Sequence, residues 1–242
     1  MTHIFYFKIS NQRFIGALLF LFITVIGFSQ SARDNYNYRD FQKKPFYFGI
    51  TMGANSTSFK LDHSKNFIGN DSIRIVEPDS GPGINLHMIA NLKIGEYFDF
   101  RLLPGFSFAE RNLVFTPVEG DVINTRKIES VFFEIPFLLR FKSAPYKDKR
   151  AFVIGGVKYS YDVASNSKAR QSKSLVKISP HDFQIEIGAG MQFFYPYFIF
   201  SPEIKYSRGI VNSLIYNSEL NEARVIEGAV TQVISIAFHF EG

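Results

Sequence analysis

The sequence FQIEIGAGMQFFYPYFIFSPEIKY, Phe183–Tyr206, contains two patterns of alternating apolar and polar residues joined by Tyr195-Pro196. Every second residue from Phe183 to Phe193 is apolar, with Gln, Glu and Gly between them. A period of two produces two distinct faces only in a β-strand. We therefore predict a β-hairpin with one wholly apolar face.

The length of the two patterns indicates where this hairpin lies. Strands in soluble sheets are usually about five or six residues long, whereas these run for about eleven. A tilted strand of about nine to eleven residues crosses a bilayer. Glycines and a few charges on the other face suit the crowded interior of a barrel. The hairpin therefore predicts a transmembrane β-barrel.

Six further stretches show the same period of two. They are residues 46–55, 84–94, 98–108, 130–142, 153–162 and 230–240. Four long stretches without it are predicted to be loops: Ser56–Pro82, Leu113–Glu129, Ala164–Asp182 and Arg208–Ala229. An even number of strands, with alternating short and long connections, is typical of outer-membrane barrels. The predicted fold is all-β: an eight-stranded antiparallel up-and-down transmembrane barrel, OmpA-like, over residues 45–242.

Aromatic residues and prolines refine this prediction. Aromatic side chains are expected to form girdles at the membrane surfaces. The periplasmic girdle is predicted to contain Tyr47, Phe98, Phe141, Phe193, Phe198 and Phe238, and the outer one Phe108, Tyr161 and Tyr206. Pro104, Pro136 and Pro202 fall within predicted strands, where proline is unusual. We expect a local bulge at each of them.

Two water-soluble folds fit these patterns less well. A β-sandwich hides its apolar faces against each other and seldom keeps so many long strands. A lipocalin-like barrel points its apolar face inward, so the glycine-rich faces would lie in water. We therefore expect the apolar faces to contact lipid.

Residues 1–29 are arranged like a secretory signal peptide. Lys8 and Arg13 precede the apolar run Phe14–Phe28, and Ser29-Gln30 follows it. A basic start, a short apolar run and small residues before a polar segment are typical of a cleaved signal. An uncleaved helical anchor is the alternative, but the run is short for a span of about 20 residues. Residues 30–44 show neither the period of a strand nor that of a helix. They are predicted to be a periplasmic lead-in to a barrel in the outer membrane.

The composition excludes several classes of protein. The chain has no Cys, so no disulfide framework can form. A mean hydropathy of -0.01 and one long apolar run exclude a polytopic helical membrane protein. Loss of Lys8 and Arg13 with the signal would reduce the bases from 27 to 25 against 22 acids, a net charge of +3. This charge is small and dispersed, so no nucleic-acid partner is expected.

The sequence contains no recognisable catalytic motif. His63, His87, His181 and His239 lack the spacing of metal ligands. Gly188-Ala-Gly190 lies in mid-strand, where its glycines make room for bulky neighbours and do not form a dinucleotide site. No GxSxG sequence places a nucleophile. We predict no catalytic, cofactor-binding or metal site, no small-molecule substrate, and therefore no enzyme.

Four charged residues alternate in sign on successive predicted strands: Glu134, Lys158, Glu186 and Lys205. All four point inward at a similar height, and neighbouring strands lie about 4.8 Å apart. We predict a belt of ion pairs that cross-links the wall, since the bore of an eight-stranded barrel is filled by side chains. The alternative is a proton or ion path. We favour the structural role because loss of one partner of a buried pair costs about 3 to 5 kcal/mol.

Three segments resemble the PorT (SprT) family of Bacteroidota-type bacteria. They are KKPFYFGITMGANS (43–56), FEIPFLLRFK (133–142) and ISPHDFQIEIGAGMQFFYPYFIFSPEIKYSRGIVN (178–212). The second is common among small outer-membrane barrels of that phylum, and the third is more specific. The resemblance covers most of the chain after the signal.

This resemblance implies a component of the type IX secretion system, which exports cargo across the outer membrane and in some species supports gliding motility. It provides no catalytic or ligand-binding residues. An eight-stranded bore is too narrow for folded cargo, so we expect an accessory that lies in the lipid bilayer and acts through other secretion-system proteins. A free-standing scaffold, an adhesin-like barrel or a porin-like barrel is the alternative.

Overall fold

The computed structural model describes residues 35–63, 73–117, 124–164, 177–215 and 226–242. The predicted signal peptide, residues 1–29, lies outside these ranges. Among the described residues, no helix is long and apolar enough to cross a membrane. The elements are α2 (Tyr36–Gln42), β1 (Phe46–His63), β2 (Ile73–Lys93), β3 (Phe98–Leu102), β4 (Gly105–Pro117), β5 (Asn124–Lys142), β6 (Lys149–Asp162), β7 (Lys177–Ile178), β8 (His181–Phe194), β9 (Ile199–Gly209), β10 (Leu214–Ile215) and β11 (Ile226–Glu241).

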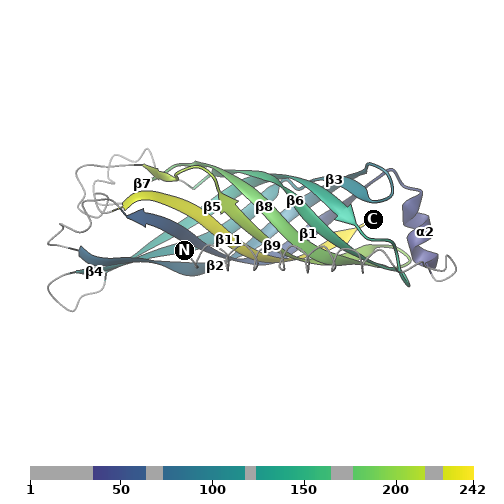
Figure 1. Ribbon diagram of the computed structural model, residues 1–242, viewed down its shortest axis with the longest axis horizontal. Coiled ribbons are helices and arrows are strands. Elements are labelled where there is room, and N and C mark those ends of the chain that lie inside the picture. Colours follow the sequence, from purple (N-terminus) through teal and green to yellow (C-terminus); the bar gives the residue numbers. More distant parts are fainter. Residues whose placement is uncertain (1–34, 64–72, 118–123, 165–176, 216–225) are drawn as a thin grey trace, which may run out of the picture. The chain divides into compact units, whose positions relative to one another are not determined.

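The main sheet of the described residues is a closed antiparallel ring (Figure 1). Its strand order is β1-β11-β9-β8-β6-β5-β3-β2-β4, and the pairing of β1 with β2 closes it. Both β3 and β4 pair with β2 on one side and β5 on the other, so these two strands occupy one position. The predicted eight-stranded barrel is therefore confirmed.

The seam between β1 and β11 joins strands that are far apart in the chain. Their register runs from Gly49 opposite Glu241 to Asp62 opposite Gly228. Gly49 permits this close pairing, because a Cβ atom there would lie 2.3 Å from the carbonyl oxygen of Phe240.

Two predicted loops are largely β-strand, and the other two are partly so. β1 continues to His63 and β2 begins at Ile73, so Thr57 pairs with Gly81 inside the first predicted loop. β4 and β5 likewise extend into Leu113–Glu129. The middle parts of all four loops lie outside the described residues. The prediction failed because outward residues such as Glu77 and Asp79 are polar and exposed here, which removes the period of two while backbone pairing continues.

The barrel is apolar outside and polar inside. Most of its buried residues are polar or charged, and its outward residues include Phe48, Ile84 and Met88, which are 62%, 62% and 69% exposed. An exposed apolar surface of this extent marks contact with lipid. The predicted lipid-facing side chains therefore lie outside, with one exception: Tyr47 is buried in the lumen and does not belong to a girdle.

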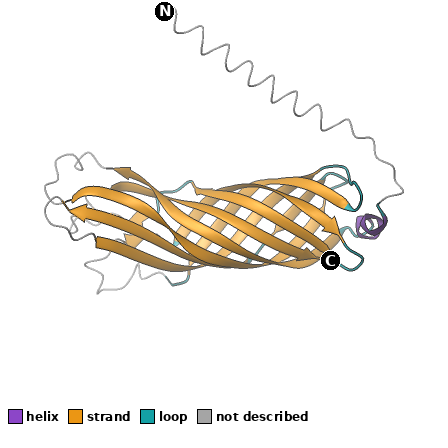
Figure 2. Ribbon diagram, turned by 90° about the horizontal axis from the view of Figure 1, so that it is seen from below, coloured by secondary structure: helices purple, strands orange, loops and turns teal. Residues whose placement is uncertain are grey.

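The predicted short turns lie together at one end of the barrel, here called the short-turn end. They connect β2 to β3 through Gly95, whose φ of +107° suits glycine, β5 to β6 through residues 143–148, and β8 to β9 through Tyr195-Pro196. α2 lies at the same end (Figure 2). The opposite end is called the long-loop end.

The three strand prolines do not all behave as predicted. Pro104 interrupts the strand between β3 and β4, whereas the registers around Pro136 and Pro202 continue without a shift. The expected bulges are therefore absent at these two positions. Pro136 faces the interruption, because its carbonyl accepts a hydrogen bond from the amide of Leu103 at 3.2 Å. Pro136 has no amide hydrogen to donate to the neighbouring strand, but that strand is already interrupted at this point.

Candidate functional site

The four residues of the predicted belt lie side by side in the lumen. The Lys158 ammonium is 3.0 Å from Glu134 Oε1 and 3.4 Å from Glu186 Oε1. The Lys205 ammonium is 3.4 Å from Glu186 Oε2. All four side chains are buried. That this belt (Glu134, Lys158, Glu186 and Lys205) has a structural role stays a prediction.

The strand register explains these contacts. Lys158 is directly opposite Pro136 on β5 and Gln184 on β8, so its ion pairs with Glu134 and Glu186 are diagonal, two residues along each neighbouring strand. Diagonal neighbours are about 7 to 8 Å apart at their Cα atoms, within reach of long side chains. The belt therefore follows the tilt of the strands.

The belt has two contacts that sequence reasoning missed. His87 Nε2 on β2 lies 3.1 Å from Glu134 Oε2, and the Ser207 hydroxyl donates to Glu186 Oε1 at 2.7 Å. His87 had no metal-ligand spacing, and its inward position in the period of two was the only signal.

A second cluster of charges, here called the inner network, lies nearer the short-turn end. It consists of Asp99, Arg101, Arg140, Glu203 and Glu241, all fully buried. The Arg101 guanidinium is 2.6 Å from Glu241 Oε1 and 3.4 Å from Glu203 Oε2. The Arg140 guanidinium is 2.7 Å from Asp99 Oδ2 and 3.4 Å from Glu241 Oε1. No local pattern in the sequence predicts this network.

Further side chains complete the inner network. Arg140 also donates to the Tyr47 hydroxyl and to Asn91 Oδ1, and Lys142 donates to Asp99. His239 Nε2 lies 3.3 Å from Glu203 Oε2. The alternation along β1 points Tyr47 inward, away from the lipid, and the hydrogen bond from Arg140 satisfies its buried hydroxyl.

An apolar layer lies between the belt and the inner network on one side of the lumen, whereas on β9 Glu203 and Lys205 are consecutive inward residues. It consists of Ile89, Leu103, Leu138, Phe152 and Ile154. Leu138, for example, lies on β5 between Glu134 and Arg140 and has no exposed surface. The three layers together fill this part of the lumen with side chains, as expected for a ring of eight strands.

Two glycines of β8 make room for this layer. A Cβ atom on Gly188 would lie 3.0 Å from Ile154 Cγ1, and one on Gly190 would lie 2.5 Å from Phe152 Cζ. The prediction that these glycines accommodate bulky neighbours is therefore confirmed.

Nearer the long-loop end, the lumen contains Arg111 between two aromatic rings. Its guanidinium carbon is 4.9 Å from the centroid of Phe59 and 4.7 Å from that of Phe132. Two of its nitrogens, Nε and Nη2, have no hydrogen-bond partner among the described residues. Arg111 thus packs mainly through its flat faces.

Helix α2 lies in the predicted lead-in and was not expected. The amide of Tyr38 donates to Asp148 Oδ1 at 2.9 Å, and the amide of Asp148 donates to Asn35 Oδ1 at 3.1 Å. Asp148 and Lys147 form a two-residue turn with φ of 55° and 48°, a conformation that aspartate tolerates. A helix of 7 residues is unstable alone, so this reciprocal capping by the barrel explains why it forms.

Apolar and cationic contacts hold α2 on the barrel. Tyr38 and Phe41 are buried with Tyr47, Phe194 and Ile199 in one cluster. The Tyr38 hydroxyl also accepts a hydrogen bond from Arg150 Nη1 at 3.1 Å. Burial raises the pKa of the Tyr38 hydroxyl above its ordinary value of 10.0, so the phenol stays neutral at physiological pH.

One known protein family matches most of the chain. The outer-membrane protein β-barrel domain family matches residues 28–214. The chain belongs to this family. This barrel domain is therefore an outer-membrane protein in contact with the lipid bilayer, as the sequence predicted.

Three solved structures are similar to this chain at low sequence identity. The outer membrane protein OprG from Pseudomonas aeruginosa is 14% identical, with a TM-score of 0.49, covering 81% of this chain and 95% of that one. Ail, the attachment invasion locus protein of Yersinia pestis, is 12% identical, with a TM-score of 0.35, covering 82% and 100%. The translocator domain of the autotransporter NalP from Neisseria meningitidis is 7% identical, with a TM-score of 0.37, covering 85% and 96%. No curated protein sequence shows significant similarity to the chain.

The predicted lack of catalytic, cofactor-binding and metal sites stays a prediction. Within the described ranges, no group of three or more His, Asp and Glu residues could hold a metal ion. His87 and His239 instead contact single glutamates in the lumen.

Proposed function

We propose that this outer-membrane barrel is an accessory component of the type IX protein secretion system, with a role in gliding motility where the two are linked. The proposal rests on the resemblance of residues 43–56, 133–142 and 178–212 to the PorT (SprT) family. The barrel acts through partner proteins and is neither the translocation channel nor an enzyme.

The filled lumen is the observation that carries the accessory role. The belt, the apolar layer and the inner network occupy successive levels of the bore, which in an eight-stranded ring has room only for side chains. A cargo protein cannot pass through it. The same filling supports an accessory role over a porin-like one.

The short-turn end offers a surface for partners. Outer-membrane barrels place their short turns in the periplasm, where secreted cargo arrives. Tyr36 on α2 is 81% exposed and Tyr197 in the β8–β9 turn is 90% exposed. Exposed tyrosines are frequent anchors of protein interfaces. We therefore place the partner contact at these two residues.

Deletion of the gene tests the function. We expect type IX cargo to accumulate inside the cell or periplasm while other outer-membrane barrels assemble normally, as measured by immunoblots of culture supernatant and cell fractions. If export continues but surface attachment or solute uptake changes, the secretion role is wrong and a scaffold, adhesin-like or porin-like function replaces it.

A double variant tests the partner surface. Tyr36→Ser with Tyr197→Ser should reduce export, whereas Glu77→Ser with Asp79→Ser at exposed positions towards the long-loop end should not. Both proteins should still migrate differently before and after boiling in SDS, which reports a folded barrel. Normal export by the tyrosine variant would show that the partner does not bind at Tyr36 and Tyr197.

A further inference from the structure

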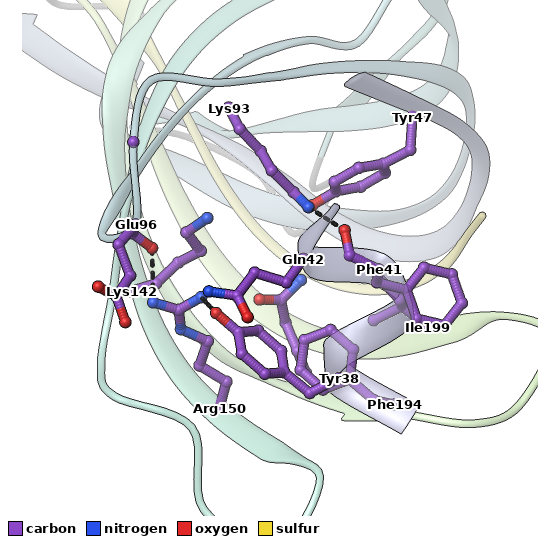
Figure 3. A pocket seen from close by; sticks show the side chains of 12 residues that line it. Tyr38, Phe41, Gln42, Tyr47, Lys93, Glu96, Lys142, Arg150, Phe194 and Ile199 are labelled. Atoms are coloured by element: carbon purple, nitrogen blue, oxygen red, sulfur yellow. Dashed lines mark hydrogen bonds between the residues drawn. The ribbon is translucent and has the colours of Figure 1, made fainter. Parts of the chain in front are cut away.

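A small chamber lies between α2 and the short-turn end of the barrel (Figure 3). Its volume is ≈ 40 Å³. A buried water needs about 10 to 15 Å³ by this measure, so the chamber has room for several waters or one small ion. The side chains of Gln42, Tyr38 and Gln192 line it together with three cations.

The three cations come from different strands. Lys93 ends β2, Lys142 ends β5 and Arg150 lies near the start of β6. Lys142 and Arg150 are each only 3% exposed. The sheet therefore gathers three positive charges around one cavity, and α2 covers them.

The lysines have donors to spare. Among the described residues, Lys93 donates to the carbonyl of Phe41 and Lys142 donates to Asp99, one hydrogen bond each. An ammonium group carries three donors, so each lysine has two more. Arg150 differs, because its nitrogens donate to Ser143, Tyr38 and Glu96.

Nearby acids offset only part of this charge. Glu96 also lines the chamber, and its backbone carbonyl accepts a hydrogen bond from Arg150. Asp99 is shared between Lys142 and Arg140, so the three cations still outnumber the acids beside them. The chamber thus combines excess positive charge, spare N–H donors and the amides of Gln42 and Gln192. Such a set suits an oxyanion with several acceptor oxygens.

We propose that the chamber binds a phosphate group. The donors lie on four different elements, α2, β2, β5 and β8, and therefore approach the chamber from several directions. A tetrahedral phosphate can accept hydrogen bonds from several directions at once. Its source is either a phospholipid headgroup of the inner leaflet or free phosphate. Exposed Tyr97 and Phe98 beside the chamber mark the headgroup level, where aromatic residues gather.

Binding of phosphate would also stabilise the docked helix. Gln42 belongs to α2, whereas Lys93 and Lys142 belong to the barrel, so one ligand bridges the two parts. A ligand that binds only the docked state shifts the equilibrium towards it. This inference is independent of the proposed role in secretion.

Titration with inorganic phosphate tests the site. The chain, purified from outer membranes in a phosphate-free detergent, should produce a saturable change in the ³¹P NMR signal. Lys93→Gln should weaken binding about tenfold, since a charge-assisted hydrogen bond is lost. Lys93→Arg should preserve binding, and Lys43→Gln, an equal charge loss on an exposed residue outside the chamber, should have no effect.

A second arm identifies the source. Short-chain phosphatidylglycerol replaces inorganic phosphate in the same titration. The ligand that binds with the higher affinity identifies the source of the phosphate group as a lipid headgroup or free phosphate. Gln192→Met, which removes an amide without changing charge, should weaken binding about threefold. The proposal is overturned if neither ligand gives a saturable signal, or if Lys43→Gln weakens binding as much as Lys93→Gln.

Discussion

The belt and the inner network both consist of buried ion pairs but connect the barrel in different directions. Belt pairs join neighbouring strands: β5 to β6, β6 to β8, and β8 to β9. In the inner network, Arg101 of β3 reaches Glu203 of β9, and Arg140 of β5 reaches Glu241 of β11. These strands lie on opposite sides of the ring and share no backbone hydrogen bonds.

This difference assigns distinct mechanical roles to the two clusters. The belt reinforces contacts that the backbone ladder already makes, so it mainly resists sliding of adjacent strands. The inner network holds opposite walls together, where the described strands have no backbone pairing. We therefore expect larger losses of stability from the inner network.

The largest effect is expected for Arg140→Leu. This change removes the ion pairs to Asp99 and Glu241 and leaves buried carboxylates short of a partner, which should cost about 5 kcal/mol. The measurement is urea unfolding of the refolded barrel in lipid vesicles. Arg208→Leu, at an exposed position on β9, should change the free energy of unfolding by only about 0.5 kcal/mol. An equal loss of unfolding free energy in both variants would show that Arg140 stabilises the barrel no more than an exposed charge does.

A smaller effect is expected for the belt. Lys158→Ala should cost about 3 kcal/mol, because Glu134 keeps His87 and Glu186 keeps Lys205 as partners. The matched control is Lys60→Ala on the exposed side of β1. If Lys158→Ala destabilises the barrel more than Arg140→Leu does, the ranking of the two clusters is wrong.

Pairwise coupling within the belt should be smaller again. Lys158→Ala and Glu186→Ala together should cost less than the sum of the two single changes, by about 1 to 2 kcal/mol. Additive costs would show that the pair at 3.4 Å does not interact energetically.

The smallest effect concerns α2, which covers the short-turn end beyond the inner network and has no counterpart at the belt. The raised pKa of Tyr38 means that docking is fully stabilised below the ordinary tyrosine pKa and is lost as pH rises through the higher docked value. The chain has no Cys, so a dye on Tyr36→Cys reports docking by its anisotropy. We expect the anisotropy to fall above about pH 10 and to stay level in a Tyr38→Phe background. A fall of equal size in that background would assign the effect to other groups.

The belt could be predicted because its partners are neighbours. The period of two places Glu134 and Lys158 inward, and counting from the turns gives their height. The partners of Arg101 lie across the lumen, and their identity depends on the stagger of the strands in the closed ring. No local sequence pattern contains information on this stagger. Tyr47 was assigned to a girdle from its residue type, although its period placed it inward.

α2 could not be predicted for a related reason. Its first turn has no side-chain cap of its own, and the carboxylate that accepts its Tyr38 amide belongs to Asp148, 110 residues away. A helix that depends on tertiary contacts leaves little signal in its own sequence.

The seam between β1 and β11 has a kinetic consequence. Glu241 pairs with Gly49 across this seam, and its carboxylate contacts both Arg101 and Arg140. Closing the ring thus also brings this carboxylate to two buried guanidinium groups. A half-closed barrel would combine unpaired strand edges with guanidinium groups that lack one carboxylate partner, so we expect such intermediates to be sparsely populated and assembly to be cooperative. Contacts between segments so distant in sequence form slowly, and the rate-limiting step of membrane insertion is therefore expected at this pair of strands.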